Sequence, residues 1–335
     1  MIDPHVTTTD TMTTTGTRPQ PQRLLPPRPP DDHEKYSYIQ RNLPYLTAVI
    51  LLGSVCVIIS QLRFELHDLA LSPFLAFTAV YILYQAISLP VNFAGAGFDL
   101  AAHQARIKAW RPPAYPDIDI YLPILLSTGI CPDNLDSFVR QQYRWCSGNV
   151  GIVFSWRLWK IPMSLPARLT YISGFLYYAY TALLVFFGPL IPIIMLAFLP
   201  DQIRLRNFVI LLPAMFTGFV LYPLWHRARF GPGIWPLGIA RGWAHVFAIW
   251  DGAWGKSMSW HPTRTPGSSL RRFRLGVRWW SGGAAVVWLA LAIWRMASAS
   301  HTGGAGSWQF AVLLFFGLLN SAVVSRVILP GGRPA

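Results

Sequence analysis

The sequence predicts an all-α polytopic integral membrane protein with about six transmembrane helices, together with amphipathic helices that lie in the membrane interface. Apolar residues make up 53% of the 335 residues and charged residues only 13%, whereas ordinary soluble domains carry about 25% charged residues. Apolar runs near the roughly 20 residues needed to cross the hydrocarbon recur along the chain. Basic residues gather between these runs. These observations favour a membrane protein over a soluble domain.

The formal net charge of +14 would suggest a nucleic-acid partner in a soluble protein. Here the basic residues occupy the connections between apolar runs, so anionic headgroups and the positive-inside rule explain them better. We therefore expect membrane lipids, and no nucleic acid, as partners.

The N-terminal stretch is rich in Thr and Pro and has almost no large apolar residues before Leu24. Such a composition cannot bury a core, so we expect residues 1–40 to form a disordered cytosolic tail. The stretch also lacks the basic start and apolar centre of a cleavable signal peptide. The first apolar run is therefore expected to remain in the mature protein.

Six apolar runs are expected to cross the membrane as helices. The third run is interrupted by Gly188, Pro189 and Pro192, which predict either a kinked helix or a helix followed by a short re-entrant piece. The expected spans are 44–62, 73–93, 170–199, 207–225, 279–298 and 308–328.

Two basic segments orient these spans. Residues 98–169 and 226–278 carry most of the Arg and Lys between the runs, whereas the connections 63–72 and 299–307 carry one Arg. The positive-inside rule then places both basic segments and both termini in the cytosol of a multi-pass protein of the cell (plasma) membrane. Arg204 and Arg206 lie on the other side of this arrangement and count against it at the third and fourth spans.

Two cytosolic stretches have the pattern of helices that lie in the membrane interface. Residues 98–111 set small and aromatic residues against a basic face. Residues 235–258 carry several Trp residues, whose rings favour the headgroup level. We interpret these Trp residues as membrane anchors, with a sugar-stacking surface as the alternative.

A motif lies within residues 138–149, FVRQQYRWCSGN, which contain a Gln-x-x-Arg-Trp pentad from Gln141 to Trp145. The pentad follows the segment LSTGICPDNLDSF and stands just before an apolar run. This combination resembles the processive family-2 glycosyltransferases of the cellulose-synthase and hyaluronan-synthase type. The resemblance implies a helix at the cytosolic mouth of a membrane channel, a nucleotide-sugar donor, a polysaccharide product and a bacterial source.

By this resemblance, Gln141, Arg144 and Trp145 bind the acceptor and the diphosphate. The residue types suit those roles. An Arg side chain can donate a planar fork of hydrogen bonds to a diphosphate as charge develops on it, and a Trp side chain offers a flat apolar face to a sugar ring. The alternative is that Arg144 and Trp145 only anchor an interfacial helix.

The acidic residues do not complete a catalytic centre. Metal-assisted glycosyl transfer uses carboxylates to hold Mg²⁺ or Mn²⁺ and a further carboxylate as base. The family's Mg²⁺ or Mn²⁺ is expected, but its Asp-x-Asp and base motifs have no counterpart here, so no metal site and no intact catalytic residue is predicted. Whether the chain is an enzyme stays open.

The only Asp-x-Asp is Asp117-Ile118-Asp119, in YPDIDIYLPI, whose alternation predicts a strand. This strand resembles the first strand of the family's α/β glycosyltransferase domain. Ile124 then leads directly into sequence that resembles the far end of the same domain. We infer that a stretch of about domain size, roughly 100–250 residues, is missing and that only a stub of the domain remains.

A weaker match lies at residues 256–267, KSMSWHPTRTPG. It resembles the loop that closes over the nucleotide site in this family: Trp260 and Thr263 fit, Arg264 takes the basic role, and Pro262 departs from the pattern. An ordinary basic, Pro-rich loop is the alternative.

Four segments follow, and the last contains a cytosolic loop at 226–278. They are the tail 1–40, two transmembrane helices and an interface helix in 41–112, the glycosyltransferase remnant 113–169, and channel-type helices in 170–335. The leading interpretation is a membrane-embedded polysaccharide synthase of family 2 that is catalytically incomplete in this chain. The alternative is a non-catalytic membrane channel or scaffold subunit derived from that family, which leaves room for a partner subunit.

Overall fold

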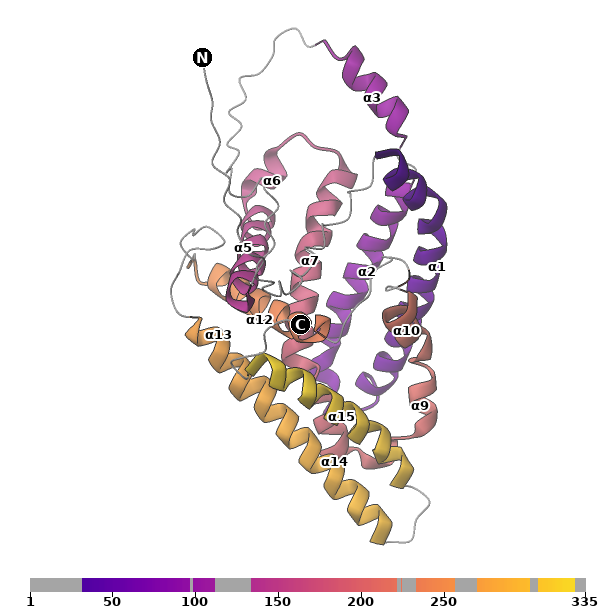
Figure 1. Ribbon diagram of the computed structural model, residues 1–335, viewed down its shortest axis with the longest axis vertical. Helices are drawn as coiled ribbons and strands as arrows, with labels where there is room; N and C mark the ends of the chain where they lie inside the picture. The colour runs from indigo at the N-terminus through magenta and orange to yellow at the C-terminus, as the bar shows by residue number, and fades with distance from the viewer. Residues whose placement is uncertain are drawn as a thin grey trace, which may run out of the picture.

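The computed structural model describes residues 32–96, 99–111, 134–221, 224, 233–256, 270–301 and 307–328. Within these ranges the chain is helical and contains no strand. Long helices lie side by side in an elongated bundle (Figure 1). Five helical segments of the described chain are long and apolar enough to cross a membrane. These findings agree with the predicted all-α membrane protein.

An antiparallel pair of helices, α1 (Asp32–Glu65) and α2 (Leu75–Ala96), begins the bundle and is joined through the 3-10 turn η1 (Ser72–Phe74). Polar side chains inside the pair bond to one another, because hydrocarbon offers them no water. Thr78 Oγ1 donates to Glu65 Oε1 at 2.8 Å, and Tyr81 donates to Ser54 at 3.1 Å.

Helix α1 starts earlier than expected, so that residues 32–40, which were assigned to the tail, are helical. Residues 1–31 lie outside the described part of the chain.

Helix α3 (Leu100–Ala109) covers the expected interface helix at 98–111 and stands apart from the bundle (Figure 1). Asp99 caps it by accepting a hydrogen bond from the backbone N–H of Ala102 at 3.0 Å. None of its residues is buried. Its position at a membrane surface stays a prediction.

The third expected span forms two helices, α7 (Leu165–Phe187) and α8 (Leu190–Phe198). They meet at Gly188 and Pro189, as the sequence predicts, since a proline cannot donate the hydrogen bond that would continue the first helix. The two helices still form one apolar segment, residues 165–198.

The fourth expected span, 207–225, is not one continuous helix in the described residues. It consists of α9 (Leu205–Val209), α10 (Leu212–Phe216) and a π-helical turn, η3 (Thr217–Leu221). Pro213 lies in the first turn of α10. It has no N–H to donate to the carbonyl oxygen of Val209, the last residue of α9, so the hydrogen bonds of α9 do not continue into α10.

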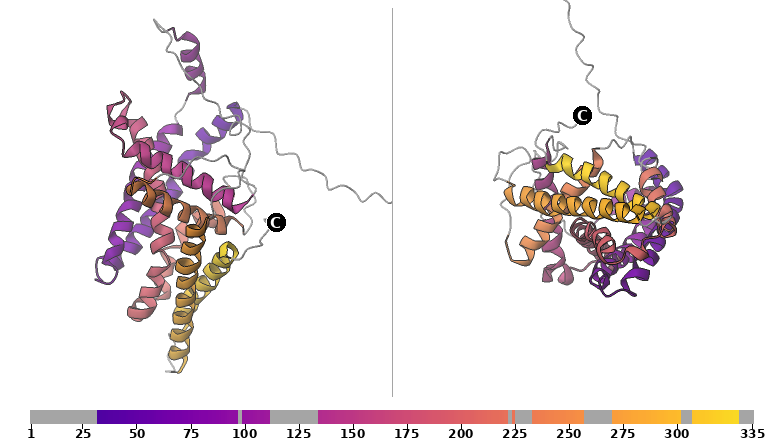
Figure 2. Two further views of the ribbon diagram at one scale, coloured as in Figure 1. Left: turned by 90° about the vertical axis from the view of Figure 1, so that its left-hand side faces the viewer. Right: turned by 90° about the horizontal axis from the view of Figure 1, so that it is seen from below.

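The C-terminal part contains α12 (Ile234–Ala253), α13 (Arg271–Leu275), the π-helical η4 (Gly276–Gly282), α14 (Gly283–His301) and α15 (Ser307–Ile328). Residues 271–300 form one apolar segment. Helices α14 and α15 lie next to one another (Figure 2, right).

Helix α5 (Leu135–Val153), followed by the short α6 (Trp156–Lys160), runs obliquely to the long helices (Figure 2, left). A buried apolar cluster joins α5, α12, α13 and η4, and α7 packs against it. The oblique helix is therefore part of the core of the bundle. Its buried members include Val139, Tyr143, Cys146, Val150, Trp243, Ala244, Ala248, Phe273 and Val277.

Candidate functional site

Helix α5 carries the Gln-x-x-Arg-Trp pentad, of which Gln142 and Tyr143 are buried in the bundle. Asn134 caps the helix by accepting a hydrogen bond from the Ser137 backbone N–H at 2.8 Å. Positions three and four residues apart share one face of a helix, so Gln141, Arg144 and Trp145 lie together. Trp145 is 55% exposed. Gln141 and Arg144 are half-buried. The structure thus brings the three predicted residues onto one partly accessible surface, which we call the pentad face.

The opposite face of α5 is fastened to two other helices by one carboxylate. Tyr143 donates from its hydroxyl to Asp251 Oδ2 of α12 at 2.9 Å. Arg272 of α13 donates to both oxygens of Asp251, at 3.0 and 2.8 Å. Such a bidentate pair fixes geometry as well as charge. The pentad face is therefore held in a defined orientation to the bundle.

The ionisation of Asp251 follows from these contacts. Burial alone would raise its pKa, but the hydrogen bonds from Arg272 and Tyr143 outweigh burial, and the pKa lies below its ordinary value. Asp251 is therefore charged at neutral pH and committed to Arg272. A second pair, Arg274 with Asp136 at 2.9 Å, joins α13 to the first turn of α5.

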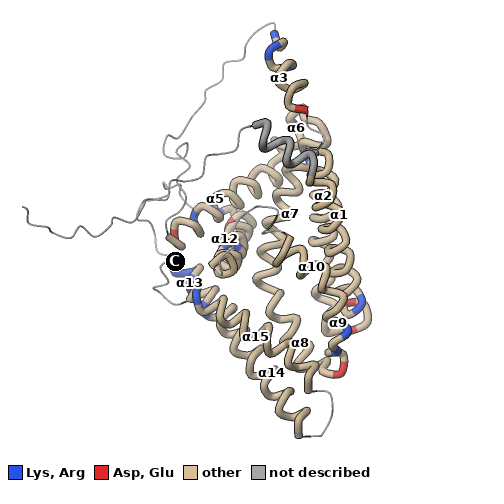
Figure 3. Tube along the Cα trace, turned by 45° about the vertical axis from the view of Figure 1, so that its right-hand side comes forward, with Lys and Arg blue, Asp and Glu red and all other residues tan. Residues whose placement is uncertain are grey.

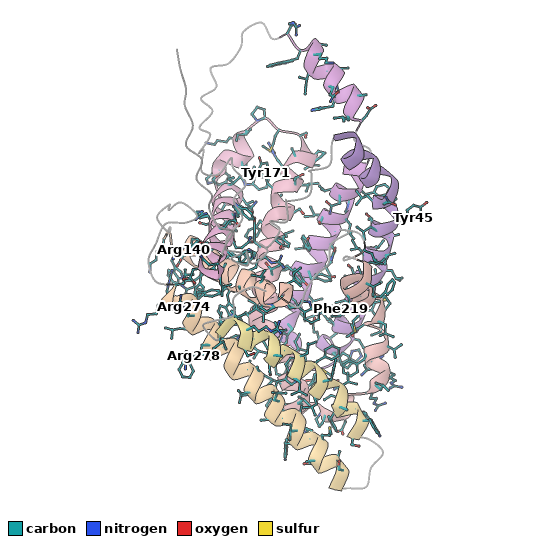
Figure 4. All side chains as sticks on the ribbon, in the orientation of Figure 1. Tyr45, Arg140, Tyr171, Phe219, Arg274 and Arg278 are labelled. Atoms are coloured by element: carbon teal, nitrogen blue, oxygen red, sulfur yellow. The ribbon has the colours of Figure 1, made fainter. Side chains whose placement is uncertain are left out.

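Arginines dominate the charge around the pentad face. Burial and the nearby charge of Arg140 lower the pKa of Arg144. Figure 4 shows Arg140, Arg274 and Arg278 along the same side of the bundle. The nearby acids Asp136 and Asp251 are each already paired with an arginine. The surface therefore favours an anionic ligand.

Behind α5 lies a histidine that the sequence did not single out as functional. His245 of α12 is 0% exposed, and its Nδ1 lies 2.6 Å from Thr181 Oγ1 on α7. That hydroxyl also lies 3.0 Å from the carbonyl oxygens of Tyr177 and Tyr178. Because its one hydrogen is directed to a carbonyl, Nδ1 of His245 is the donor in the pair.

His245 and its neighbour Cys146 are both held in their neutral forms. Burial, and then the charge of Arg241, lowers the pKa of His245 to about 3. Burial raises the pKa of the Cys146 thiol to about 12, so the thiolate needed for nucleophilic chemistry is absent at neutral pH. Both residues act in packing.

Several residues singled out from the sequence lie outside the described part of the chain. They are Asp117 and Asp119 of the expected strand and Trp260, Thr263 and Arg264 of the expected gating loop. The structure therefore does not relate them to the pentad face.

The described residues do not fit Mg²⁺ or Mn²⁺. No group of three or more His, Cys, Asp or Glu residues gathers within the described ranges, whereas both ions need several oxygen ligands. Asp251, the carboxylate that contacts α5, is already bonded to Arg272 and Tyr143. No step of a reaction is therefore derived through a metal.

Comparison with known proteins gives no relative. No protein-family model, no curated protein and no solved structure matches the chain.

Proposed function

We propose that the chain is the membrane and interface portion of a family-2 polysaccharide synthase, whose sugar-transfer centre is incomplete in this chain. One observation carries the proposal. Gln141, Arg144 and Trp145 share a partly exposed face of a helix whose other face is fixed to the bundle through Asp251. A motif that only anchored a helix would not need that fixed orientation.

The pentad face has the chemistry to hold a diphosphate and a sugar. Arg144 presents donors for phosphate oxygens, Trp145 presents an exposed aromatic plane, and Gln141 can bond to hydroxyls. The inherited reaction would transfer a sugar from a nucleotide donor to an acceptor hydroxyl. The family's Mg²⁺ or Mn²⁺ would stabilise the leaving diphosphate, and the described residues do not supply its ligands.

In this proposal the protein resides in the cell membrane of a bacterium, with about six crossings and both termini in the cytosol. The segment 205–221 would provide the crossing between α8 and the C-terminal helices in three short pieces. The pentad face and the basic residues of α13 would then lie on the cytosolic side, where nucleotide sugars are found.

A non-catalytic channel or scaffold subunit is the second candidate, and a cavity supports it. A hollow of 490 Å³ lies between α7, α12, η4, α14 and α15. Its lining includes Thr181, Arg241, Ser281 and Asn320 among apolar side chains. Polar groups that line a hollow inside an apolar bundle are typical of a path for a polar solute. This reading needs no transfer chemistry.

Titration of the protein in lipid nanodiscs with uridine diphosphate separates the two candidates. Each hydrogen bond from a charged donor contributes about 1.5–3 kcal/mol, so without a metal site we expect binding near millimolar, equal to roughly −4 kcal/mol. Arg144→Gln should weaken it about tenfold. Arg106→Gln on α3 is the matched control and should leave it unchanged.

Supplied with Mg²⁺ or Mn²⁺ and nucleotide sugars, the protein alone should make no polymer. An affinity for uridine diphosphate that is unchanged in Arg144→Gln would favour the channel or scaffold subunit. Micromolar binding, or polymer formation by the single chain, would contradict the incomplete centre.

A further inference from the structure

An apolar cavity of 510 Å³ is lined in part by α1 and the short helices that follow α8, and these helices lie on the side of the bundle away from α5 (Figure 1). It is lined by residues of α1, η1, α8, the short helices α9 and α10, and the hairpin of α14 and α15. Its walls include Phe208, Leu211 and Met215 of the short helices, with Met195 and Trp288 opposite. A pocket of this size with mostly apolar walls and few polar groups is typical of a ligand site.

One polar atom at the cavity has no hydrogen-bond partner in the part of the chain that the structure describes. Glu65, at the C-terminal end of α1, lines the cavity and is 5% exposed. Its Oε1 accepts the hydrogen bond from Thr78, but its Oε2 is buried and has no hydrogen-bond partner among the described residues. A buried, unsatisfied carboxylate oxygen is costly. A hydrogen-bond donor from outside the chain would remove that cost.

A basic vestibule adjoins the cavity. A second hollow of 420 Å³ shares Phe64, Arg204 and Asn207 with the first and adds Arg63 and Arg206. Among the described residues that line it, Asp201 is the only acidic one. Figure 3 shows these charges gathered where α9 lies beside the end of α1. The vestibule therefore carries net positive charge next to a buried carboxylate.

The position of the two hollows matches the depth of a lipid headgroup. Glu65 is the last residue of the apolar segment 42–65, and Arg204 follows the apolar segment 165–198. Both therefore lie where a membrane-spanning segment meets the headgroup region. The apolar cavity extends from this level into the part of the bundle that faces hydrocarbon.

We propose that the joined hollows bind one membrane phospholipid with a phosphoethanolamine headgroup. An acyl chain occupies the 510 Å³ cavity, the phosphate lies against Arg204 and its basic neighbours, and the primary ammonium donates to Glu65 Oε2. The pairing is complementary in charge, because a carboxylate beside an arginine matches an ammonium beside a phosphate. Inorganic phosphate would use only the vestibule, and a soluble ligand would leave the apolar walls unfilled.

The headgroup chemistry supplies a sharp test. Phosphatidylcholine has the same charges, but its trimethylammonium has no hydrogen to donate; phosphatidylglycerol has hydroxyl donors without a positive charge. Protein reconstituted with equimolar mixtures of the three lipids is extracted, and the retained lipid is measured by native mass spectrometry. We expect the ethanolamine lipid to be retained at least fivefold over each of the other two.

Variants assign the contacts. Glu65→Gln keeps the size of the side chain and should abolish the preference for ethanolamine over choline. Met215→Trp, which fills the cavity, and Arg204→Gln should each reduce retention of all three lipids at least threefold. Arg106→Gln on the exposed helix α3 is the matched control. Melting temperatures and gel filtration identify any variant that fails to fold. If either Met215→Trp or Arg204→Gln fails to fold, the other variant still tests whether retention of the three lipids falls.

A photoreactive ethanolamine lipid, with its diazirine in the acyl chain, locates the site independently. Adducts are expected on peptides that contain Met195, Phe208 or Met215. Adducts confined to other helices, or equal retention of the three lipids by the unmodified chain, would overturn the proposal. Complete displacement of the lipid by millimolar inorganic phosphate would do so too, because the site would then belong to a free anion.

Discussion

At the scale of single residues, burial and neighbouring charge hold a titratable side chain in one protonation state. His245 shows the principle most clearly. Its Nδ1 donates to Thr181, the ring of Tyr178 packs edge-on against it at 4.8 Å, and Arg241 lies near on the same helix. Burial and the positive neighbour both oppose a proton on the ring. His245 therefore stays neutral in the folded protein at pH values where an exposed histidine is protonated.

This histidine predicts how stability depends on pH. The pKa of His245 in the folded protein, about 3, lies below the ordinary value of 6.5. Between these two pH values the unfolded chain binds a proton at His245 and the folded chain does not. The stabilisation is fully present above pH 6.5 and is lost as pH falls toward 3, with a slope of up to about 1.4 kcal/mol per pH unit. Melting temperatures of the detergent-solubilised protein between pH 7.5 and pH 5 measure the loss.

The non-titrating variant His245→Asn should flatten that pH dependence. His67→Gln, at an exposed histidine just beyond α1, is the control and should leave it unchanged. Equal slopes in wild type and His245→Asn would show that His245 does not govern the loss.

At the scale of elements, the approach of α12 to α7 depends on one glycine. A Cβ on Gly242 would lie 2.8 Å from the Cβ of Val185 and 2.9 Å from the carbonyl oxygen of Thr181. A backbone oxygen cannot move aside as the end of a flexible side chain can. The two helices therefore pack at a distance that excludes any larger residue there.

Gly242→Ala should lower the free energy of unfolding by about 1–3 kcal/mol, the usual cost of overpacking. Gly238→Ala lies one turn away on the same helix, where an added Cβ meets nothing within 4 Å. Alanine should therefore stabilise α12 there, since it exceeds glycine in helix propensity by about 1 kcal/mol. Thermal unfolding of both variants measures the contrast. Equal effects would mean that propensity, and not the contact with α7, decides.

Some helix boundaries could be predicted from the sequence and others could not. The break at Gly188 and Pro189 follows from local chemistry, namely a missing backbone donor, whereas the helix at Gln141 was expected only from the family resemblance. The division of residues 205–221 into short pieces was missed, because apolar content dominated the expectation although Pro213 was visible. The unpartnered Glu65 oxygen was also beyond reach, since it depends on which helices enclose the end of α1.

Contacts between residues far apart in the sequence were the hardest features to predict. Asp251 meets Tyr143 over a separation of 108 residues, and no local pattern connects them. The small residues at 240, 244 and 248 of α12 gave the one available signal, because their spacing of four indicates a face that another helix approaches closely.

At the scale of the whole molecule, the directions of the helices predict which residues share a side of the membrane. Helices α1 and α14 run the same way, and α3 lies at the opposite end (Figure 1). Leu69, which is 88% exposed, and Ser300 therefore lie at one end. Lys108 lies at the other.

Cysteines placed at these three positions, in a chain whose native cysteines are replaced, test the arrangement with a membrane-impermeant maleimide on intact cells. We expect Leu69→Cys and Ser300→Cys to react and Lys108→Cys to react only after permeabilisation, as the positive-inside rule requires. Labelling of Lys108→Cys on intact cells would show that the orientation in the membrane is the reverse of the one proposed. If only one of the cysteines at positions 69 and 300 reacted on intact cells, the segment 205–221 would not cross the membrane.

The link between α5 and α12 also has a consequence in time. Tyr143 precedes its partner Asp251 by 108 residues, and synthesis adds about 5–20 residues per second. The ribosome therefore needs on the order of 5–20 s to make the partner after α5 has emerged. Throughout that interval the apolar side of α5, with Val139, Cys146 and Val150, lacks its contact with α12, although α7 is made soon after α5. An amphipathic helix can lie on the membrane surface, so the bilayer can cover that side of α5 until α12 is made.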